Sequence, residues 1–379
     1  MNNKAVSILK CDTYDIKSLI KNIRSHFDNL GGIDKFVKKG TRVLIKANLI
    51  MGKKADAAVT TNPNFIEALS KVIIEAGGIV TIADSPGGPF TPILLKSVYK
   101  ASGMDKAAAN SGAELNFDCT YKKIKAVNPV VSNDFNFISP FFSADLLISA
   151  CKLKTHSKTA YTGAVKNLFG LIPGLEKPEF HSRYSELDKF CNMLIDICET
   201  AKPGLSFMDG IVAHEGNGPT GGSPKKVGLT LASENPYSLD LAASYIIGFE
   251  PNEVMTVKNS IERGLTQKSA LDLNIIGENL REIRIPDFKK ADTNIVSMFA
   301  FLPSWLRNRI EKFLTPYPII DTPKCIGCGK CAESCAAHTI EIINKKAVIN
   351  YNNCIKCFCC QEMCPIKAIN IKRRSIFKF

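Results

Sequence analysis

Eight cysteines near the C-terminal end of the chain fall into two runs with the same spacing. The runs are Cys325-Ile-Gly-Cys328-Gly-Lys-Cys331-Ala-Glu-Ser-Cys335 and Cys354-Ile-Lys-Cys357-Phe-Cys-Cys360-Gln-Glu-Met-Cys364. Both have the pattern C-x2-C-x2-C-x3-C, through which cysteine thiolates hold [4Fe–4S] cubanes. Two residues between thiolates let a tight loop reach three corners of a cube, and a distant cysteine closes the fourth. The spacing therefore predicts two [4Fe–4S] clusters and one-electron chemistry.

The spacing also predicts which thiolates share a cluster. In two-cluster proteins with this pattern, each run gives three thiolates to one cluster and its fourth to the other. We expect the first cluster to take Cys325, Cys328, Cys331 and Cys364, and the second to take Cys354, Cys357, Cys360 and Cys335. Ala336 stands where a proline usually follows the fourth cysteine, so the backbone there is less restrained.

Cys359 is an extra thiol beside the expected ligand Cys360. Two interpretations stay open, a bystander packed near the cluster or a ligand that exchanges with Cys360. Other uses of the cysteine runs fit less well. A disulfide framework needs an oxidising compartment and usually a short secreted chain, whereas zinc ribbons use paired C-x2-C knuckles.

The chain has 379 residues, so the cysteine-rich end must be joined to something larger. No stretch approaches the roughly 18 consecutive apolar residues of a membrane span, and no apolar leader follows the first residues. We expect a cytoplasmic protein without a membrane span, where thiols stay reduced.

The formal charge of +13 raises the question of nucleic-acid binding. The lysines are scattered, however, without an aromatic-basic RNP pattern, a helix-turn-helix or a zinc finger. We expect no nucleic-acid partner. The basic excess instead favours an acidic electron-donor or electron-acceptor protein, or an anionic small-molecule substrate. Ordinary solvated lysines remain the alternative for any single residue.

Short apolar segments alternate with helical patterns before residue 250. Strands are expected at residues 42–49, 79–83, 144–150, 205–212 and 226–232, and helices at 64–76, 91–109, 185–200 and 238–247. This alternation predicts an α/β domain with a mainly parallel sheet, followed by a small α+β module that carries the clusters.

Three parts are expected along the chain: an α/β domain over residues 1–293, a helical and Pro-rich linker over 294–323, and a cluster module over 324–379. Asn294–Leu314 in the linker has an amphipathic pattern with interleaved basic residues. Two interpretations are open. The segment packs against the α/β domain, or it lies on a membrane surface.

Polar and glycine-rich segments follow several expected strands, namely Lys46–Asn48, Asp84–Gly88, Lys152–His156 and Asp209–Pro219. In an open α/β sheet the ligand crevice lies outside the carboxyl ends of the strands. We therefore expect these segments to share a crevice, although ordinary turns and helix caps give the same local patterns.

Lys166 lies among aromatic and apolar neighbours and could be desolvated there. Such a lysine serves as a proton donor or as a clamp for phosphate or carboxylate. Our candidates for substrate binding or proton delivery are Lys154, His156, Lys166 and Asp209. The sequence at residues 216–221 satisfies G-x-G-x-x-G, but another strand-like segment follows it rather than a helix, which argues against a dinucleotide site.

Three motifs in combination carry a family resemblance: Lys152-x-Lys154-Thr155-His156, Lys166-Asn167-Leu168-Phe169-Gly170, and Asp209-Gly210 followed by Glu215-Gly216-Asn217-Gly218-Pro219. They resemble the family catalogued as domain of unknown function number 362, over roughly residues 40–250. Members often carry a C-terminal bacterial-type two-cluster ferredoxin module. The resemblance implies a fused α/β and ferredoxin-like architecture and leaves the activity open.

Our leading hypothesis is an iron–sulfur oxidoreductase that passes electrons through two clusters to a substrate in the α/β domain. The alternatives are a non-enzymatic electron carrier or cluster-bearing scaffold whose α/β domain docks a partner protein, and a regulatory anion- or metal-binding domain. A catalytic domain should have a deep pocket lined by Lys154, His156, Lys166 and Asp209, whereas a docking domain should present a flat face.

Overall fold

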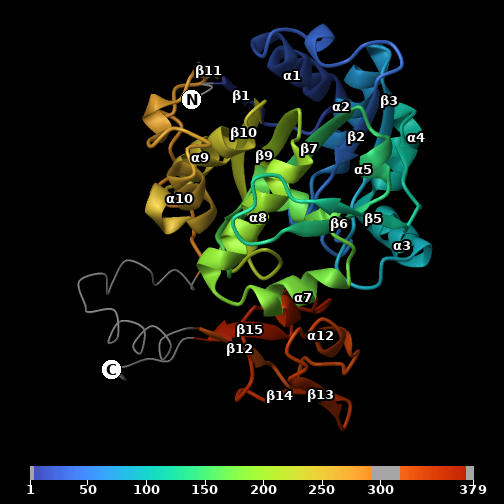
Figure 1. Cartoon of the computed structure of the whole chain (residues 1–379), viewed down its shortest axis with the longest axis vertical. Coiled ribbons are helices and arrows are strands. Elements are labelled where there is room, and N and C mark those ends of the chain that lie inside the picture. The colour runs from blue at the N-terminus through green and yellow to red at the C-terminus, as the bar shows by residue number, and fades with distance from the viewer. Residues whose placement is uncertain (1–3, 292–315, 373–379) are drawn as a thin grey trace.

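The computed structural model describes residues 4–291 and 316–372, which form a large α/β domain and a small C-terminal module (Figure 1). Within these residues the large domain is built on a nine-stranded sheet in the order β11-β1-β10-β9-β7-β2-β3-β4, with β8 paired to β7. The strands are β1 (Val6–Lys10), β2 (Arg42–Lys46), β3 (Ile79–Ala83), β4 (Glu114–Leu115), β7 (Leu146–His156), β8 (Ala160–Thr162), β9 (Leu205–Glu215), β10 (Ser223–Ser233) and β11 (Ile275–Gly277).

The central part of this sheet is parallel. β9, β7, β2, β3 and β4 all run in one direction, and β10 is antiparallel to both of its neighbours, β1 and β9. The carboxyl ends of the parallel strands therefore meet at one edge of the sheet. The predicted fold class, a mainly parallel α/β domain with a small C-terminal module of strands and helices, is confirmed.

Helices cover both faces of the sheet (Figure 1). They are α1 (Ile16–Asn29), α2 (Pro63–Glu75), α3 (Pro92–Ser102), α4 (Met104–Ser111), α5 (Pro140–Ser143), α6 (Ala164–Asn167), α7 (Glu176–Arg183), α8 (Leu187–Ala201), α9 (Pro236–Ile246) and α10 (Met255–Glu262). In β2, Val43 and Ile45 pack into the core formed with α1 and α2, whereas Leu44 packs into the core formed with α8. Successive side chains of a strand point to opposite faces, so a strand covered on both sides is apolar throughout.

Local sequence signals set the ends of the helices. α2 begins at Pro63, where no backbone N–H is needed, and the Asn62 side chain accepts a hydrogen bond from the N–H of Asn64. The helix predicted over Thr91–Ala109 is instead two helices, α3 and α4. Gly103 ends α3 with a φ of 76°, a left-handed conformation that glycine adopts without a steric penalty.

The C-terminal module contains two short antiparallel strand pairs and two helical turns. They are β12 (Tyr317–Ile320) with β15 (Ile369–Lys372), β13 (Ile340–Ile343) with β14 (Lys346–Ile349), α12 (Lys330–Glu333) and α13 (Cys359–Glu362). Pairing with β15 extends the module to Tyr317, inside the range 294–323 that we predicted as a linker. The amphipathic segment Asn294–Leu314 lies outside the described residues. In the described parts of the chain, no helix is long and apolar enough to cross a membrane.

A buried histidine links α1 to the sheet and gives stability a pH dependence. His26 is fully buried, with Nδ1 2.8 Å from the Ser7 hydroxyl and Nε2 2.9 Å from the Thr230 hydroxyl. Burial lowers its pKa to about 3. The unfolded side chain titrates near pH 6.5, so the neutral ring contributes full stability above that pH and loses it as the pH falls toward 3.

We predict that the parent loses about 1.4 kcal/mol of unfolding free energy at His26 between pH 7.5 and 5.5. A His26→Gln variant should lack this loss and show a correspondingly shallower pH dependence. Urea unfolding under anaerobic conditions at the two pH values measures the difference. Parallel pH dependences in parent and variant would show that His26 does not titrate on unfolding.

Candidate functional site

Two cavities in the C-terminal module are each surrounded by four cysteines. One is lined by Cys325, Cys328, Cys331 and Cys364, and we name it the first cage. The other is lined by Cys335, Cys354, Cys357 and Cys360, and we name it the second cage. The structure thus brings together the same two sets that the spacing grouped, including the exchange of the fourth cysteine between the runs.

The sulfur environment of the cages fits thiolate ligation of a cluster. The N–H groups of Ala347 and Ala368 donate to the Sγ atoms of Cys325 and Cys364 at 3.4 and 3.1 Å. The Cys335 Sγ accepts from the Thr339 N–H at 3.3 Å. Hydrogen bonds of this kind stabilise thiolates and tune cluster potentials.

Among residues 4–291 and 316–372, no three His, Cys, Asp or Glu side chains converge closely enough to hold one metal ion. This is compatible with a cubane, because the cubane spreads its four thiolates over four irons.

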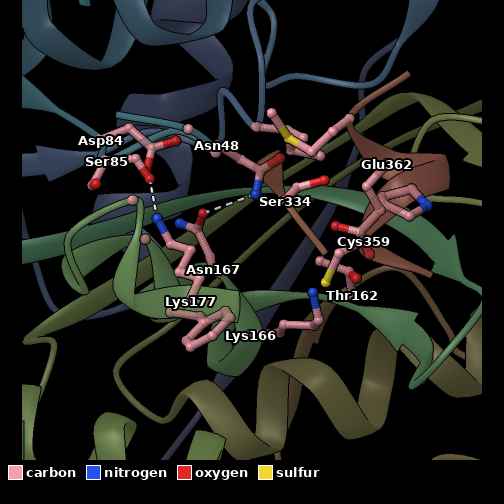
Figure 2. Close-up of a pocket in the computed structure, with 18 of the residues that line it drawn as sticks. Asn48, Asp84, Ser85, Thr162, Lys166, Asn167, Lys177, Ser334, Cys359 and Glu362 are labelled. Carbon is pink, nitrogen blue, oxygen red and sulfur yellow. Dashed lines mark hydrogen bonds between the residues drawn. The ribbon is translucent and has the colours of Figure 1, made fainter. Parts of the chain in front are cut away.

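A third cavity lies between the module and the large domain, and Cys359 lines this cavity rather than either cage. We name it the interface pocket; its volume is about 110 Å³. The α/β domain contributes Lys46, Asn48, Asp84, Lys154, Lys166 and Lys177, and the module contributes Ser334, Cys359, Glu362 and Met363. Figure 2 shows Asn48, Asp84, Lys166 and Lys177 on one side of the pocket with Ser334, Cys359 and Glu362 of the module. Lys46 ends β2, Asp84 follows β3 and Lys154 lies on β7, so the pocket is at the predicted carboxyl edge of the sheet.

A buried ion pair between Lys46 and Asp84 lines part of the pocket. The Lys46 Nζ lies 2.7 Å from the Asp84 Oδ1, and both side chains are almost fully buried. The other Asp84 oxygen accepts the N–H of Leu49 at 2.7 Å. Burial lowers the pKa of Lys46, and the Asp84 carboxylate opposes this shift. A side chain at Gly170 would overlap both members of the pair, so the close approach of this loop requires glycine.

Lys154 is fully buried and pairs with no carboxylate among the described residues: its Nζ donates to the Asn48 Oδ1 at 2.5 Å and to the Val59 carbonyl at 2.8 Å. Burial, reinforced by the nearby charge of Lys166, lowers the pKa of Lys154 well below its usual value. Neutral acceptors and a depressed pKa together favour an uncharged amine at this position.

Lys166, on α6, makes no hydrogen bond or ion pair within the described parts of the chain. Figure 2 shows its amine extending from α6 toward Cys359 and Thr162. Apart from the Glu362 Oε1, which faces His156, three further polar atoms of pocket residues are buried without a hydrogen-bond partner in those same parts: the Ser85 Oγ, the Thr162 Oγ1 and the His181 Nδ1. Buried polar groups normally have partners, so several unsatisfied groups around one cavity indicate a site for a polar ligand.

Lys177, on α7, is the pocket lysine that is suited to exchange a proton at neutral pH. Its Nζ donates to the backbone carbonyl of Ser85. Burial lowers the pKa of Lys177 to about 7, with Asp84 opposing and Lys46 adding to the shift. A lysine with this pKa exchanges its proton at neutral pH, which suits a general acid.

An interaction between His156 and Glu362 joins the two domains beside the pocket. The His156 Nε2 lies 3.1 Å from the Glu362 Oε1, and the His156 Nδ1 accepts the N–H of Lys158 at 3.0 Å. Acceptance at Nδ1 leaves the ring proton on Nε2, facing the carboxylate. Burial lowers the pKa of His156 to about 4, so the ring is neutral at pH 7. The 3.1 Å approach lacks hydrogen-bond geometry, so the predicted site residue His156 contacts the module beside the pocket and does not line the pocket itself.

The segment of the module that carries Cys360 and Cys364 makes the other contacts with the large domain. The Lys53 Nζ donates to the Pro365 carbonyl at 2.8 Å, and the Gln361 side chain donates to the Asn217 carbonyl at 3.4 Å. Met363 packs so closely on Gly87 that a side chain there would overlap its sulfur. The docked face of the module is therefore the face next to the cluster cysteines.

Asp209 lies outside the interface pocket, apart from the other predicted site residues. Its carboxylate is fully buried, 2.8 Å from the Lys152 Nζ, and accepts the Tyr14 hydroxyl at 2.8 Å and the Asn62 N–H at 3.0 Å. The structure brings Lys154 and Lys166 to the pocket, His156 to its border and Asp209 into this separate network. Ser85 belongs to the segment Asp84–Gly88, which we expected in the crevice, whereas Lys177, His181, Cys359 and Glu362 were not expected there, because no local pattern marks them.

We predict that Asp209→Ala destabilises the protein by about 3–5 kcal/mol, because it removes the only carboxylate that pairs with the buried Lys152 among the described residues and leaves the Lys152 Nζ with the Tyr14 hydroxyl at 3.1 Å. Denaturant unfolding measures the loss. The matched control is Asp287→Ala, which removes an exposed carboxylate 2.9 Å from Lys225 and should leave stability nearly unchanged. Equal stability of Asp209→Ala and the parent would contradict a structural role for the pair.

Residues 43–245 match the family model described as Domain of unknown function (DUF362), and residues 317–365 match the 4Fe-4S dicluster domain. The dicluster match shows an iron–sulfur protein that binds 4Fe–4S and transfers electrons. Thylakoid-associated protein sll1697 of Synechocystis sp. is 31% identical over 319 residues, which cover 82% of this chain and 94% of that protein.

A solved structure, the lactate racemase apoprotein from Thermoanaerobacterium thermosaccharolyticum, is similar with a TM-score of 0.35 and 13% identity. The match covers 53% of this chain and 49% of that chain, so it spans about half of the solved protein. The resemblance predicted from the three motifs is confirmed: the chain belongs to the family described as Domain of unknown function (DUF362) and carries a C-terminal 4Fe-4S dicluster domain.

Proposed function

We propose that the protein is a cytoplasmic iron–sulfur oxidoreductase that uses two [4Fe–4S] clusters and acts on a small anion bound in the interface pocket. The observation that carries this proposal is the composition of the pocket wall. Its α/β side presents lysines and unsatisfied polar groups, and its module side presents Ser334 and Cys359, each adjacent in sequence to a cysteine of the second cage. When bound, the clusters would supply one-electron transfer.

The ligand sets are those of the two cages. Cys325, Cys328, Cys331 and Cys364 would hold one cluster, and Cys354, Cys357, Cys360 and Cys335 the other. Support comes from the grouping of the sulfurs around two separate cavities and from the N–H groups directed at three of them. Cys359 lines the interface pocket and neither cage. This position favours the bystander interpretation over exchange with Cys360.

The size and charge of the pocket suggest the class of ligand. A cavity of roughly 150 Å³ accommodates benzene, so 110 Å³ admits a molecule of about six non-hydrogen atoms or fewer. Lys166 has no counter-charge in hydrogen-bond contact and is suited to hold a carboxylate or phosphate oxygen. Lys177, with a pKa of about 7, is suited to deliver a proton to the bound molecule.

A concave pocket also favours catalysis over the alternative of a carrier or scaffold with a flat docking face. A protein-docking surface has no need of a cavity lined by Lys154, Lys166 and three buried polar atoms that lack partners. Ligand pockets are concave and contain a few such convergent polar groups.

We predict that the protein purified without oxygen contains about eight iron and eight sulfide per chain, as two cubanes require. Cys328→Ala should lose about half of each, whereas Cys359→Ser should keep all, because Cys359 lines neither cage. Iron and sulfide assays with electron paramagnetic resonance measure both. Zinc in place of iron in the anaerobic parent would sink the electron-transfer proposal, and loss of a cluster from Cys359→Ser would restore the ligand-exchange interpretation.

The second prediction concerns anion binding. Inorganic phosphate, acetate and glyoxylate fit the pocket volume, and at least one should bind with measurable heat, whereas citrate should not. Lys166→Met keeps the apolar stem of the side chain and should weaken that binding by about tenfold or more, the scale of one charge-assisted hydrogen bond. Isothermal titration calorimetry measures the affinity.

Lys106→Met, on the exposed surface of α4, is the control for the loss of one positive charge and should bind like the parent. Iron content should be the same in all three proteins. The pocket assignment fails if no small anion binds, or if Lys166→Met and the parent bind with equal affinity.

A further inference from the structure

Exposed apolar side chains concentrate on the C-terminal module. The module supplies about a sixth of the described residues but six of the fourteen large apolar side chains that are exposed among them. These six are Ile326, Ile342, Ile343, Val348, Tyr351 and Ile366. A concentration of this kind on a small domain marks an interaction surface more often than scattered exposed residues do.

Three of these side chains surround the first cage. Ile326, Ile342 and Ile366 line its cavity and are 62%, 39% and 39% exposed. Cys328 is an exposed ligand, whereas the three other cysteines of the first cage are buried. The first cage therefore opens to solvent through an apolar rim. In Figure 1 the hairpin of β13 and β14, which carries Ile342, projects from the module on the side away from the α/β domain.

Positive charge borders the rim. Lys324, Lys330, Lys345 and Lys367 are exposed, and each lies next to a residue of the first cage in sequence or in space. Lys367 lies where the rim meets the α/β domain, and its Nζ donates to the Gly222 carbonyl at 3.5 Å. The backbone of Lys345, for example, packs directly on Gly327, beside Cys328. The exposed acidic residues of the same region are Glu333 and Glu341, and the half-buried Asp321 pairs with Lys324 at 3.2 Å. Two half-buried lysines add to it: the Lys346 Nζ donates to the Cys325 carbonyl at 2.6 Å, and the Lys53 Nζ to the Pro365 carbonyl at 2.8 Å. The local charge is therefore net basic even against the charge of about −2 that a bound cubane with four thiolates would bring.

We propose that this surface, the first-cage face (Ile326, Cys328, Ile342 and Ile366 with Lys324, Lys330, Lys345 and Lys367), docks an acidic one-electron carrier protein. An apolar centre with a charged rim is the usual anatomy of a protein interface. Opposite charge on the two partners steers their encounter and sets their orientation. The occupant is acidic because the rim is basic, and it is a one-electron carrier because the surface surrounds the exposed cysteine of the first cage.

This proposal rests on the cluster-bound module and is independent of which anion the interface pocket takes. Flavodoxin, an acidic protein that carries electrons on FMN, is the probe. Anaerobic calorimetry of the full-length, cluster-loaded protein with flavodoxin should show binding at low salt that weakens steeply as salt rises, because the Debye length shrinks from about 30 Å at 0.01 M to about 10 Å at 0.1 M.

Two variants of the first-cage face test it. Lys330→Glu combined with Lys345→Glu should weaken flavodoxin binding at low salt by about tenfold or more, and Ile326→Gln should weaken it severalfold at every salt concentration. Lys17→Glu combined with Lys21→Glu, on exposed positions of α1, matches the charge change, and Ile93→Gln, at an 85% exposed position of α3, matches the apolar change. Both controls should bind like the parent.

Iron content and bleaching by dithionite, a small reductant that needs no docking surface, should be the same in every variant. The proposal is overturned if flavodoxin does not bind at low salt, if the first-cage variants bind like the parent, or if the α1 and α3 controls weaken binding equally. Failure of the pocket proposal has a separate signature. It would appear as an unchanged anion affinity in Lys166→Met while flavodoxin binding stays intact.

Discussion

Burial of lysine amines at the carboxyl edge of the sheet is the constraint on which the rest of this site depends. Lys46, Lys152 and Lys154 are each 1% exposed or less. Removing an ammonium from water costs several kcal/mol unless partners compensate. Lys46 and Lys152 retain carboxylates, Asp84 and Asp209, within 3 Å, and Lys154 retains two neutral oxygens. Because each partner comes from a neighbouring strand or loop, these pairs set how the strand ends are arranged.

At the interface pocket, protein partners compensate the buried polar groups only in part. The C-terminal module forms the opposite wall of this pocket. Glu362 is the carboxylate that the module contributes, and it is engaged with His156 rather than with Lys166. Within the described residues the pocket therefore keeps the Lys166 amine, whose pKa is lowered by burial, and several hydroxyl or imidazole groups without hydrogen-bond partners. A ligand that satisfies them contacts both domains. Such a ligand stabilises the docked arrangement by its own binding free energy, since it binds only when the two walls are together.

Much of this structure could be predicted from local spacing, and the remainder depends on contacts that spacing does not encode. Cluster ligation acts over loops of two or three residues, so the cysteine runs predicted the two cages. The parallel sheet predicted the edge at which Lys46, Asp84 and Lys154 meet. The position of Asp209 at a strand end did not show that its side chain points away from the pocket, because that direction depends on the register of β9 against β7. Asp209 lies opposite Lys152 in the pairing of β7 with β9, and their charges neutralise each other inside the sheet.

Cys359 and Glu362 illustrate the other limit of sequence reasoning. They reach the pocket by the docking of a module nearly 200 residues away from Lys166 in sequence, and no periodic pattern reports such an encounter. Gly103 is a smaller case. One glycine within a helical pattern was compatible with a single helix, and only its left-handed φ divides α3 from α4. The fold class was thus predictable, while side-chain direction and domain docking were not.

The two cages have different surroundings, so the two proposed ligands would bind on different sides of the module. Ser334 and Cys359, adjacent to the second cage, lie in the wall of the interface pocket together with Met363, which is adjacent to the first. The first cage differs in that it also opens to solvent through Cys328 and an apolar rim. The α/β domain occupies the pocket side of the module, so the carrier protein proposed for the first-cage face would not compete for the space of the anion proposed for the pocket. Carrier and anion can then be bound at the same time. A single shared face would instead force the two to alternate, and the bound anion would be exposed to water at each exchange.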